Sequence, residues 1–300
     1  MKISHEFIHL RGIMESVDQV ETISVPRRVV KSRKSWADIL AVSLNVCIIL
    51  FFYFFETFYV MPQFLGWFGQ AVHFLLTTWI AYNILGNLWL CTKTLSTVGS
   101  LPPEMQQPME GEEHLWHFCN TCQRTVPPRS WHCNTCNACI LKRDHHCNFV
   151  GNCVGHNNQR YFIWFSFHAA IGSGVALFDN FLLADKHGIG FFDLITANLI
   201  IYNAFMNPGT QDFVIFYRII SVLGVNIFAV LFPAALFCSQ VVTVRNNSVM
   251  NNYCDRTYDL GIKNNLTLIL GSRRLWTFLS PNIKSPLPHN GTQWKSKRAV

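Results

Sequence analysis

Residues 39–60 read ILAVSLNVCIILFFYFFETFYV, a run in which Glu56 carries the only charge. A helix needs about 20 apolar residues to cross the roughly 30 Å of hydrocarbon in a bilayer. Three further runs, 70–91, 161–184 and 219–242, are also long enough, and Trp and Tyr lie near several of their ends, as is typical of membrane interfaces. A single such run is compatible with a buried helix in a soluble core, but four of them in 300 residues favour a membrane. We therefore predict four transmembrane helices.

The composition of the whole chain agrees with this prediction. Charged residues make up 14% of the sequence, whereas about 25% is usual in soluble domains. The 24 basic and 17 acidic residues leave a net charge of +7, and 25 residues are Phe. So many large apolar side chains with so few charges exclude a disordered chain, collagen and a coiled coil. We expect an all-α, polytopic membrane protein.

Basic residues lie on alternate sides of the predicted helices. The connection 61–69 has no charged residue, and the third connection contains only Lys186 and Arg218 as bases, whereas the N-terminus, the middle segment and the tail are rich in Lys and Arg. Because cytosolic loops carry an excess of basic residues, we expect both termini and the middle segment to face the cytosol.

The apolar stretch 190–206 is short for a span, and we interpret it as a loop packed on the bundle. The predicted parts are a cytosolic segment 1–36, the first two helices 37–92, a cytosolic domain 93–160, the last two helices with a lumenal loop 161–242, and a cytosolic tail 243–300.

Acidic residues are rare in the predicted helices, and each of them is a candidate for function. Asp38 and Glu56 lie near opposite ends of the first helix, and Asp179 lies near the end of the third. We expect these three carboxylates to reach the membrane interface rather than to form a site.

The middle segment contains a dense cluster of metal-binding residue types. Residues 119–153 read CNTCQRTVPPRSWHCNTCNACILKRDHHCNFVGNC, with seven Cys and three His. The reducing cytosol disfavours disulfides, so repeated Cys-x-x-Cys pairs here indicate metal. Two closed tetrahedral zinc sites would use eight of the ten candidate ligands and leave one thiol and one imidazole. A thiol beside a base is the combination that nucleophilic catalysis requires.

The spacing within residues 144–147 narrows the choice of the free imidazole. In an extended chain, His145 and His146 point to opposite sides, while Cys147 lies on the same side as His145. One imidazole can therefore bind metal while the other faces away, and Asp144 would need a local bend to hold the tautomer of His145. The spacing alone leaves open which cysteine is free.

This pattern resembles the DHHC family of protein S-acyltransferases. The resemblance covers about 44 continuous residues, and the position of the cluster between the second and third helices is also similar to the family's architecture. The elements that carry it are Cys119-x2-Cys122, Pro127-x-Arg129, His132-Cys133-x2-Cys136-x2-Cys139, Asp144-His145-His146-Cys147 and Cys153, with Asn158 and Phe162 beyond.

The resemblance implies a role for each residue of the cluster. It implies Cys147 as the nucleophile, His145 as its base and Asp144 as the residue that orients His145. Asn265 resembles an Asn of the family's C-terminal motif, and we interpret it as structural. The two implied zinc sites are Cys119, Cys122, His132 and Cys139, and Cys133, Cys136, His146 and Cys153.

Several positions depart from the family's pattern. Val126 stands where a basic residue is usual, and 244–252 read VRNNSVMNN where Thr-Thr-x-Glu is expected. Thr97-Val98-Gly99 replaces an Asp-Pro-Gly, and Asn148-Phe149 replaces a Pro-Trp. Without a charge at 126, the candidates for contacting coenzyme A phosphates are Arg129, Lys142 and Arg143.

The resemblance implies an enzyme that moves a long-chain, palmitoyl-type acyl group from acyl-CoA to protein cysteines, by ping-pong thioester exchange through an acyl-Cys147 intermediate. Its expected partners are long-chain acyl-CoA, membrane-apposed proteins with cytosolic cysteines and the lipid bilayer, with two structural zinc ions and no nucleic acid. Lys297-Arg298 near the C-terminus weakly resembles a retrieval signal, and we expect the ER or Golgi.

Two other classes of function compete with this one. The first is a membrane-anchored zinc module that binds partners without catalysis. A ubiquitin-ligase RING is disfavoured as such a module because its closing Cys-x2-Cys pair is missing. A degenerate acyltransferase that acts as a scaffold is the stronger version. A transporter is disfavoured because we find no internal repeat. Acyl-CoA labelling of the purified protein separates an enzyme from a scaffold.

Overall fold

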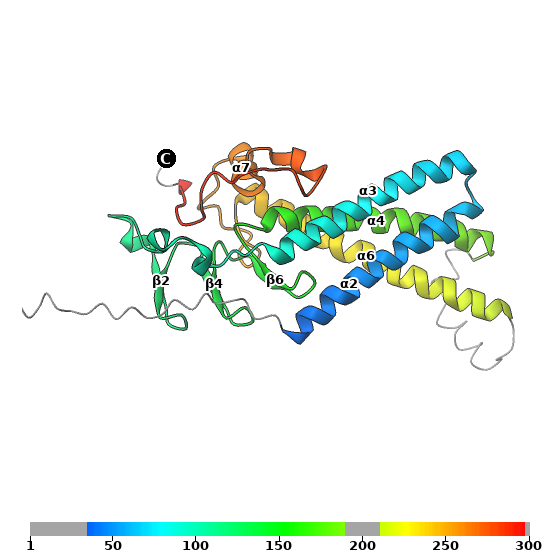
Figure 1. The fold of residues 1–300 in the computed structure, drawn as a ribbon, viewed down its shortest axis with the longest axis horizontal. Helices are drawn as coiled ribbons and strands as arrows, with labels where there is room; N and C mark the ends of the chain where they lie inside the picture. Colours follow the sequence, from blue (N-terminus) through cyan, green and yellow to red (C-terminus); the bar gives the residue numbers. More distant parts are fainter. Residues whose placement is uncertain (1–34, 190–210, 298–300) are drawn as a thin grey trace, which may run out of the picture. The chain divides into compact units, whose positions relative to one another are not determined.

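The computed structural model describes residues 35–189 and 211–297, all within one compact unit, Lys31–Val300 (Figure 1). Four helices in the described part are long and apolar enough to cross a membrane, which confirms the predicted number. The apolar stretch 190–206 lies outside the described residues. The four helices are α2 (Trp36–Phe55, extended to Gln63 by the turns Glu56–Val60 and Met61–Gln63), α3 (Trp67–Lys93), α4 (Gln159–Lys186) and α6 (Gln211–Asn246).

Helix α2 begins where its sequence provides an N-terminal cap. The Ser35 Oγ accepts a hydrogen bond from the Asp38 backbone N–H at 3.0 Å, and an Asp38 carboxylate oxygen accepts one from the Ser35 N–H at 2.9 Å. This reciprocal capping box satisfies two N–H groups that a helix start otherwise leaves without partners. Asp38 therefore has a fixed position in the first turn of α2, at the end of this helix that lies closest to the Cys-rich segment.

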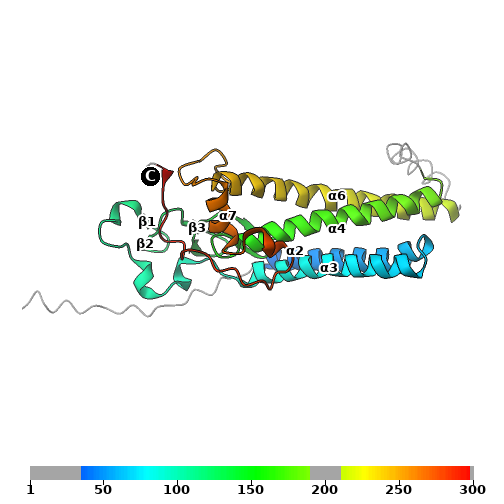
Figure 2. The ribbon, with the colours of Figure 1, turned by 90° about the horizontal axis from the view of Figure 1, so that it is seen from above.

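The long helices run side by side, and α4 packs against both α3 and α6 (Figure 2). Gly172 allows the close approach of α4 to α3, because a Cβ atom built on it would lie 2.9 Å from Cγ2 of Ile80. Small residues have this role in many membrane helix pairs.

The Cys-rich segment between α3 and α4 folds into three antiparallel hairpins of three-residue strands. The pairs are β1 (His117–Cys119) with β2 (Arg124–Val126), β3 (Trp131–Cys133) with β4 (Ala138–Ile140), and β5 (His145–Cys147) with β6 (Asn152–Val154). The helical membrane fold with a Cys-rich domain between the second and third spans is thus confirmed, and short hairpins are added to it. Isolated two-stranded hairpins are marginal in water, so these require further stabilisation.

The tail after α6 packs back on the bundle and contains a short helix, α7 (Ile262–Leu270). Asn265 is buried, accepts a hydrogen bond from the Leu260 N–H at 3.1 Å, and donates to the Arg245 carbonyl at 2.9 Å. These bonds close the loop between α6 and α7, which agrees with the structural interpretation of Asn265.

Candidate active site and metal centres

The first metal-binding group joins the hairpins β1–β2 and β3–β4. The Nδ1 atom of His132 lies 3.2 Å from the Cys122 sulfur, and the Cys139 sulfur lies 3.5 Å from that of Cys122. The Cys122 N–H also donates to the Cys119 sulfur at 3.4 Å. The four ligand atoms lie within 4.8 Å of one another, which is the arrangement that a tetrahedral ion requires.

The second group joins β3–β4 to β5–β6. Its members are Cys133, Cys136, His146 and Cys153, whose ligand atoms also lie within 4.8 Å of one another. The His146 Nδ1 lies 3.3 Å from the Cys136 sulfur, while its Nε2 lies 3.0 Å from the Asp38 Oδ1. A carboxylate on the outer nitrogen of a ligand histidine fixes the tautomer and orients the ring. The expectation that Asp38 only reaches the interface was therefore wrong, because Asp38 is buried and supports this group.

The hairpin β3–β4 contributes to both groups. Adjacent strand residues point to opposite faces, so His132 serves the first group and Cys133 the second. Three thiols and one imidazole are a donor set that holds structural zinc in proteins, and the residues present fit such an ion. The predicted pairing of all eight ligands is the one that the structure brings together.

Cys147 belongs to neither group and lies beside Asp144 and His145. The Nδ1 of His145 is 2.9 Å from the Asp144 Oδ2, so the chain makes the local bend that the sequence required. Burial alone lowers the pKa of His145, but hydrogen bonds to Asp144 and Cys147 raise this pKa to about 9. An imidazole with this proton affinity can take the thiol proton and pair with the resulting thiolate.

Asp144 is itself held by two groups from α6 and the tail. The Gln240 Nε2 donates to the Asp144 Oδ2 at 2.8 Å, and the Met250 backbone N–H donates to the Oδ1 at 2.6 Å. Burial opposes ionisation, but these bonds and His145 hold the pKa of Asp144 below its usual value. The segment that lacks the expected Thr-Thr-x-Glu therefore still contacts Asp144, through its backbone.

The three candidate phosphate contacts have different environments. The Arg129 guanidinium lies 4.5 Å from the ring of Tyr258 and 4.2 Å from that of Trp294. Lys142 is buried, and burial together with the charge of Arg129 holds its pKa well below the usual range. Arg143 is partly exposed, and its Nε has no hydrogen-bond partner among the described residues.

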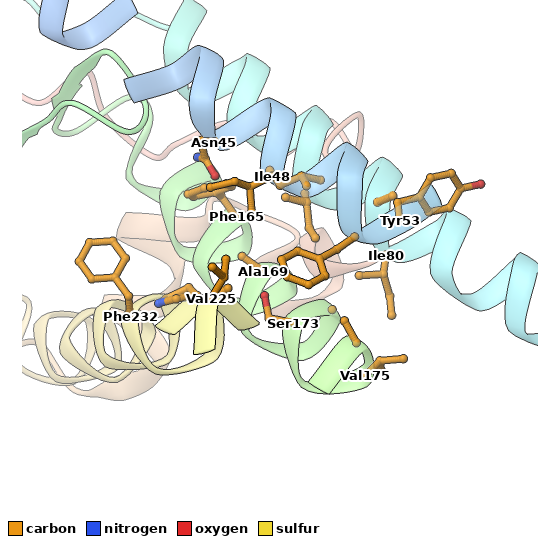
Figure 3. Close-up of a pocket in the computed structure, with 18 of the residues that line it drawn as sticks. Asn45, Ile48, Tyr53, Ile80, Phe165, Ala169, Ser173, Val175, Val225 and Phe232 are labelled. Carbon is orange, nitrogen blue, oxygen red and sulfur yellow. The ribbon is translucent and has the colours of Figure 1, made fainter. Parts of the chain in front are cut away.

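A cavity of about 180 Å³ extends from Cys147 between the membrane helices (Figure 3). Its wall is mainly aliphatic and aromatic, and Figure 3 shows Ile48, Phe165 and Ala169 pointing into it. Asn45 and Glu56 both line the cavity from α2, and they lie about three turns, or roughly 16 Å, apart along this helix. Glu56 is at the end of the lining that is far from Cys147. The space has the apolar character that a hydrocarbon chain requires.

The far end of this cavity is polar, contrary to the expectation for two of the acidic residues. The Glu56 Oε1 accepts a hydrogen bond from Asn180 at 2.6 Å, and Asn180 also donates to Asn226 at 2.9 Å. Asp179 lies 3.0 Å from the Nε2 of His73. Glu56 and Asp179 are thus buried and bonded between helices rather than extended to the interface.

Comparison with known proteins decides the family. A model described as DHHC palmitoyltransferase matches residues 112–257. A mouse protein named "Probable palmitoyltransferase ZDHHC24" is 30% identical over 78% of this chain and 82% of its own length. The chain belongs to the DHHC palmitoyltransferase family. A zebrafish protein of the same name is 32% identical over 71% of this chain and 73% of its own length, and a human one is 29% identical over 80% and 84%.

Within this palmitoyltransferase, the positions that sequence reasoning missed are those supplied from outside the Cys-rich segment. Asp38 comes from α2, Gln240 from α6 and Met250 from the tail. A carboxylate at a helix start and a glutamine in an apolar helix are both rare enough to be noticed. Nothing in the sequence indicates which partner each of them meets.

Proposed function

We propose that this protein is a protein-cysteine S-acyltransferase that takes a long-chain acyl group, palmitoyl or similar, from acyl-CoA. The observation that supports this proposal most strongly is the position of Cys147. It is the one cysteine of the Cys-rich segment outside both metal groups, it shares strand β5 with His145, and it lines the apolar cavity. An acyl thioester formed there would have its chain in the cavity.

The proposed reaction has two half-reactions. His145 takes the proton of the Cys147 thiol, and the thiolate attacks the thioester carbonyl carbon of acyl-CoA. The carbon–sulfur bond to coenzyme A breaks, and His145 returns the proton to the departing thiolate. A substrate cysteine then attacks the acyl-Cys147 carbonyl in the same way, and the Cys147 thiol is regenerated.

The proposed role of the two metal ions is structural. Zinc bound by three thiolates and an imidazole has no open coordination position, and it would make the three short hairpins rigid. Both groups include residues of β3–β4, and the second includes His146, which lies next to His145. Metal binding would therefore fix the strand that carries the nucleophile.

The proposed binding of coenzyme A uses the basic residues around the site. Arg143 is available to contact phosphate directly, Arg129 adds positive charge behind it, and the Lys142 amine adds N–H donors. The Cys-rich segment and both termini would face the cytosol, where acyl-CoA and the cysteines of membrane-apposed proteins are present, and the protein would reside in the ER or Golgi.

The test is incubation of the purified protein with labelled palmitoyl-CoA. The proposal predicts a hydroxylamine-labile label on the wild type that is lost in Cys147→Ser, with two zinc ions retained in both proteins. An unlabelled wild type that still contains two zinc ions would instead support the scaffold function.

A further inference from the structure

A chain of buried hydrogen bonds extends from Lys142 to the candidate catalytic Asp144. The Lys142 Nζ donates to the Gln159 Oε1 at 2.7 Å, and the Gln159 Nε2 donates to the Gln240 Oε1 at 3.0 Å. The Gln240 Nε2 then donates to the Asp144 Oδ2 at 2.8 Å. The two glutamines come from the first turn of α4 and the last turns of α6.

The Asp144 end of this chain determines the orientation of both amides. A carboxylate has only acceptors, so the Gln240 nitrogen must face Asp144 and its oxygen must face Gln159. The Gln159 nitrogen then faces Gln240, and its oxygen faces Lys142, whose amino group can donate whether or not it is charged. Each amide has one orientation that satisfies both neighbours, so the three bonds depend on one another.

None of the four residues in this hydrogen-bond chain can replace its partner with water. Lys142, Gln159 and Asp144 are 2%, 2% and 1% exposed, and Gln240 is 0% exposed. A buried polar group that loses its partner is destabilised, because water cannot take the partner's place. The hydroxyl of Thr243, 3.4 Å from the Gln159 Nε2 and 3.3 Å from the Gln240 Oε1, is the further polar neighbour at the centre.

We propose that Gln159 and Gln240 are positioning residues for the catalytic site, which fix the Asp144 carboxylate and, through it, the His145 ring opposite Cys147. They bind neither acyl-CoA nor the substrate cysteine. Their effect on turnover rests on the proposed acyltransferase function, but their effect on the reactivity of Cys147 does not.

The most informative variant is Gln159→Glu, because residue 159 has no direct bond to Asp144. A carboxylate at 159 still accepts from Lys142 but no longer donates to Gln240. The Gln240 amide then rotates to donate to Glu at 159 and turns its oxygen toward Asp144, which breaks the bond that orients this carboxylate.

We expect Gln159→Glu to lower the rate at which iodoacetamide alkylates Cys147 about tenfold. The alkylation is measured by mass spectrometry in the absence of acyl-CoA, and the exposed Cys254 serves as an internal reference. The rate of autoacylation should fall by a similar factor, with little change in the KM for palmitoyl-CoA. If the alkylation rate falls but no acyl label forms even in the wild type, the acyltransferase function fails while the positioning role stands.

Gln63→Glu is the matched control. The Gln63 Oε1 also accepts from a lysine, Lys186, at 2.9 Å, but it lies at the opposite end of α2 from the site. This variant should keep the wild-type rates, since the same chemical change is made outside the chain of hydrogen bonds.

Gln240→Met, which keeps volume and removes the donor, provides a second test. It should show the same slow alkylation while the protein retains two zinc ions. Wild-type alkylation in both Gln159→Glu and Gln240→Met would overturn the proposal. Loss of zinc in both would assign these residues to folding and would overturn it equally.

Discussion

Asp38, in the first turn of α2, accepts a hydrogen bond from the Nε2 of His146 at 3.0 Å, although 108 positions separate the two residues. The His146 Nδ1 faces the thiols of Cys133, Cys136 and Cys153. The first membrane helix is therefore connected to the second metal group, and through it to strand β5 with Cys147.

Replacement of Asp38 by Ala should weaken metal binding at the second group. Loss of such an outer carboxylate typically costs 10- to 100-fold in metal affinity, so one of the two zinc ions should become easier to remove. The measurement is the zinc content per polypeptide during titration with a chelator. Asp179→Ala is the control, because Asp179 pairs with His73 at the same 3.0 Å outside both groups. Equal retention of both ions in the two variants would contradict the role of Asp38.

Arg129→Lys should loosen the C-terminal tail. The Arg129 guanidinium lies over the rings of both Tyr258 and Trp294 and donates to the Asn247 carbonyl at 2.6 Å. Lysine cannot reproduce this planar, multidentate contact, and we expect a loss of about 1–3 kcal/mol in stability, estimated from cation–π and hydrogen-bond values. The measurement is the rate of tryptic cleavage in the tail, with Arg124→Lys as the control. If cleavage is unchanged and only the KM for acyl-CoA rises, Arg129 acts on coenzyme A instead.

Acidic pH should also release the tail. Burial is the main cause that lowers the pKa of His156 to about 3 and that of His289 to about 4, and the two rings stack at 4.8 Å. Both folded-state values lie below the unfolded value near 6.5, so the unfolded state binds more protons in acid. The stability associated with neutral imidazoles is complete above pH 6.5 and is lost as the pH falls toward 4.

This pH effect can be measured by proteolysis of the tail with a protease that is active from pH 5 to 8. Cleavage should accelerate between pH 6.5 and 5 in the wild type. In His289→Gln, which has no titrating group at this position, the acceleration should be smaller. An identical pH dependence in the two proteins would show that His289 does not contribute.

The cavity should set the length of the acyl chain that the protein accepts. Ala169→Phe places a ring among the lining residues of α4 and should lower autoacylation with palmitoyl-CoA more than with a shorter acyl-CoA. Ala170→Phe is the matched control, because the adjacent position is not part of the lining. The ratio of the initial rates with the two donors is the measurement, and a ratio that changes equally in both variants would refute this assignment of the cavity.

The sequence predicts the helices well because a membrane requires long apolar runs. The third span begins at Gln159 rather than at 161, and the fourth extends over 211–246 rather than 219–242, because polar helix ends continue beyond the hydrocarbon. The three hairpins escaped prediction, because strands of three residues such as His145–Cys147 contain too few positions to show alternation.

The presence of two metal groups could be predicted because the cysteines and histidines are close in sequence and numerous enough, whereas the assignment of the eight ligands, and of Cys147 as the free thiol, came from the resemblance to the DHHC family. The partners of the triad could not be predicted, because helices distant in sequence supply them. Gln240 and Asp38 contact Asp144 and His146 only after the bundle has assembled. The acidic residues of the spans were misjudged for the same reason, since their distance from a helix end does not reveal a partner such as Asn180 on a neighbouring helix.

The central claim is that both metal groups together leave Cys147 as the reactive thiol. Its most direct test is mass spectrometry of the native protein after incubation with palmitoyl-CoA, combined with the zinc content of the same sample. The account predicts two zinc ions per chain and a single acyl adduct, located on Cys147. An adduct on Cys47, Cys238 or Cys254 instead, or fewer than two ions in an active protein, would contradict it.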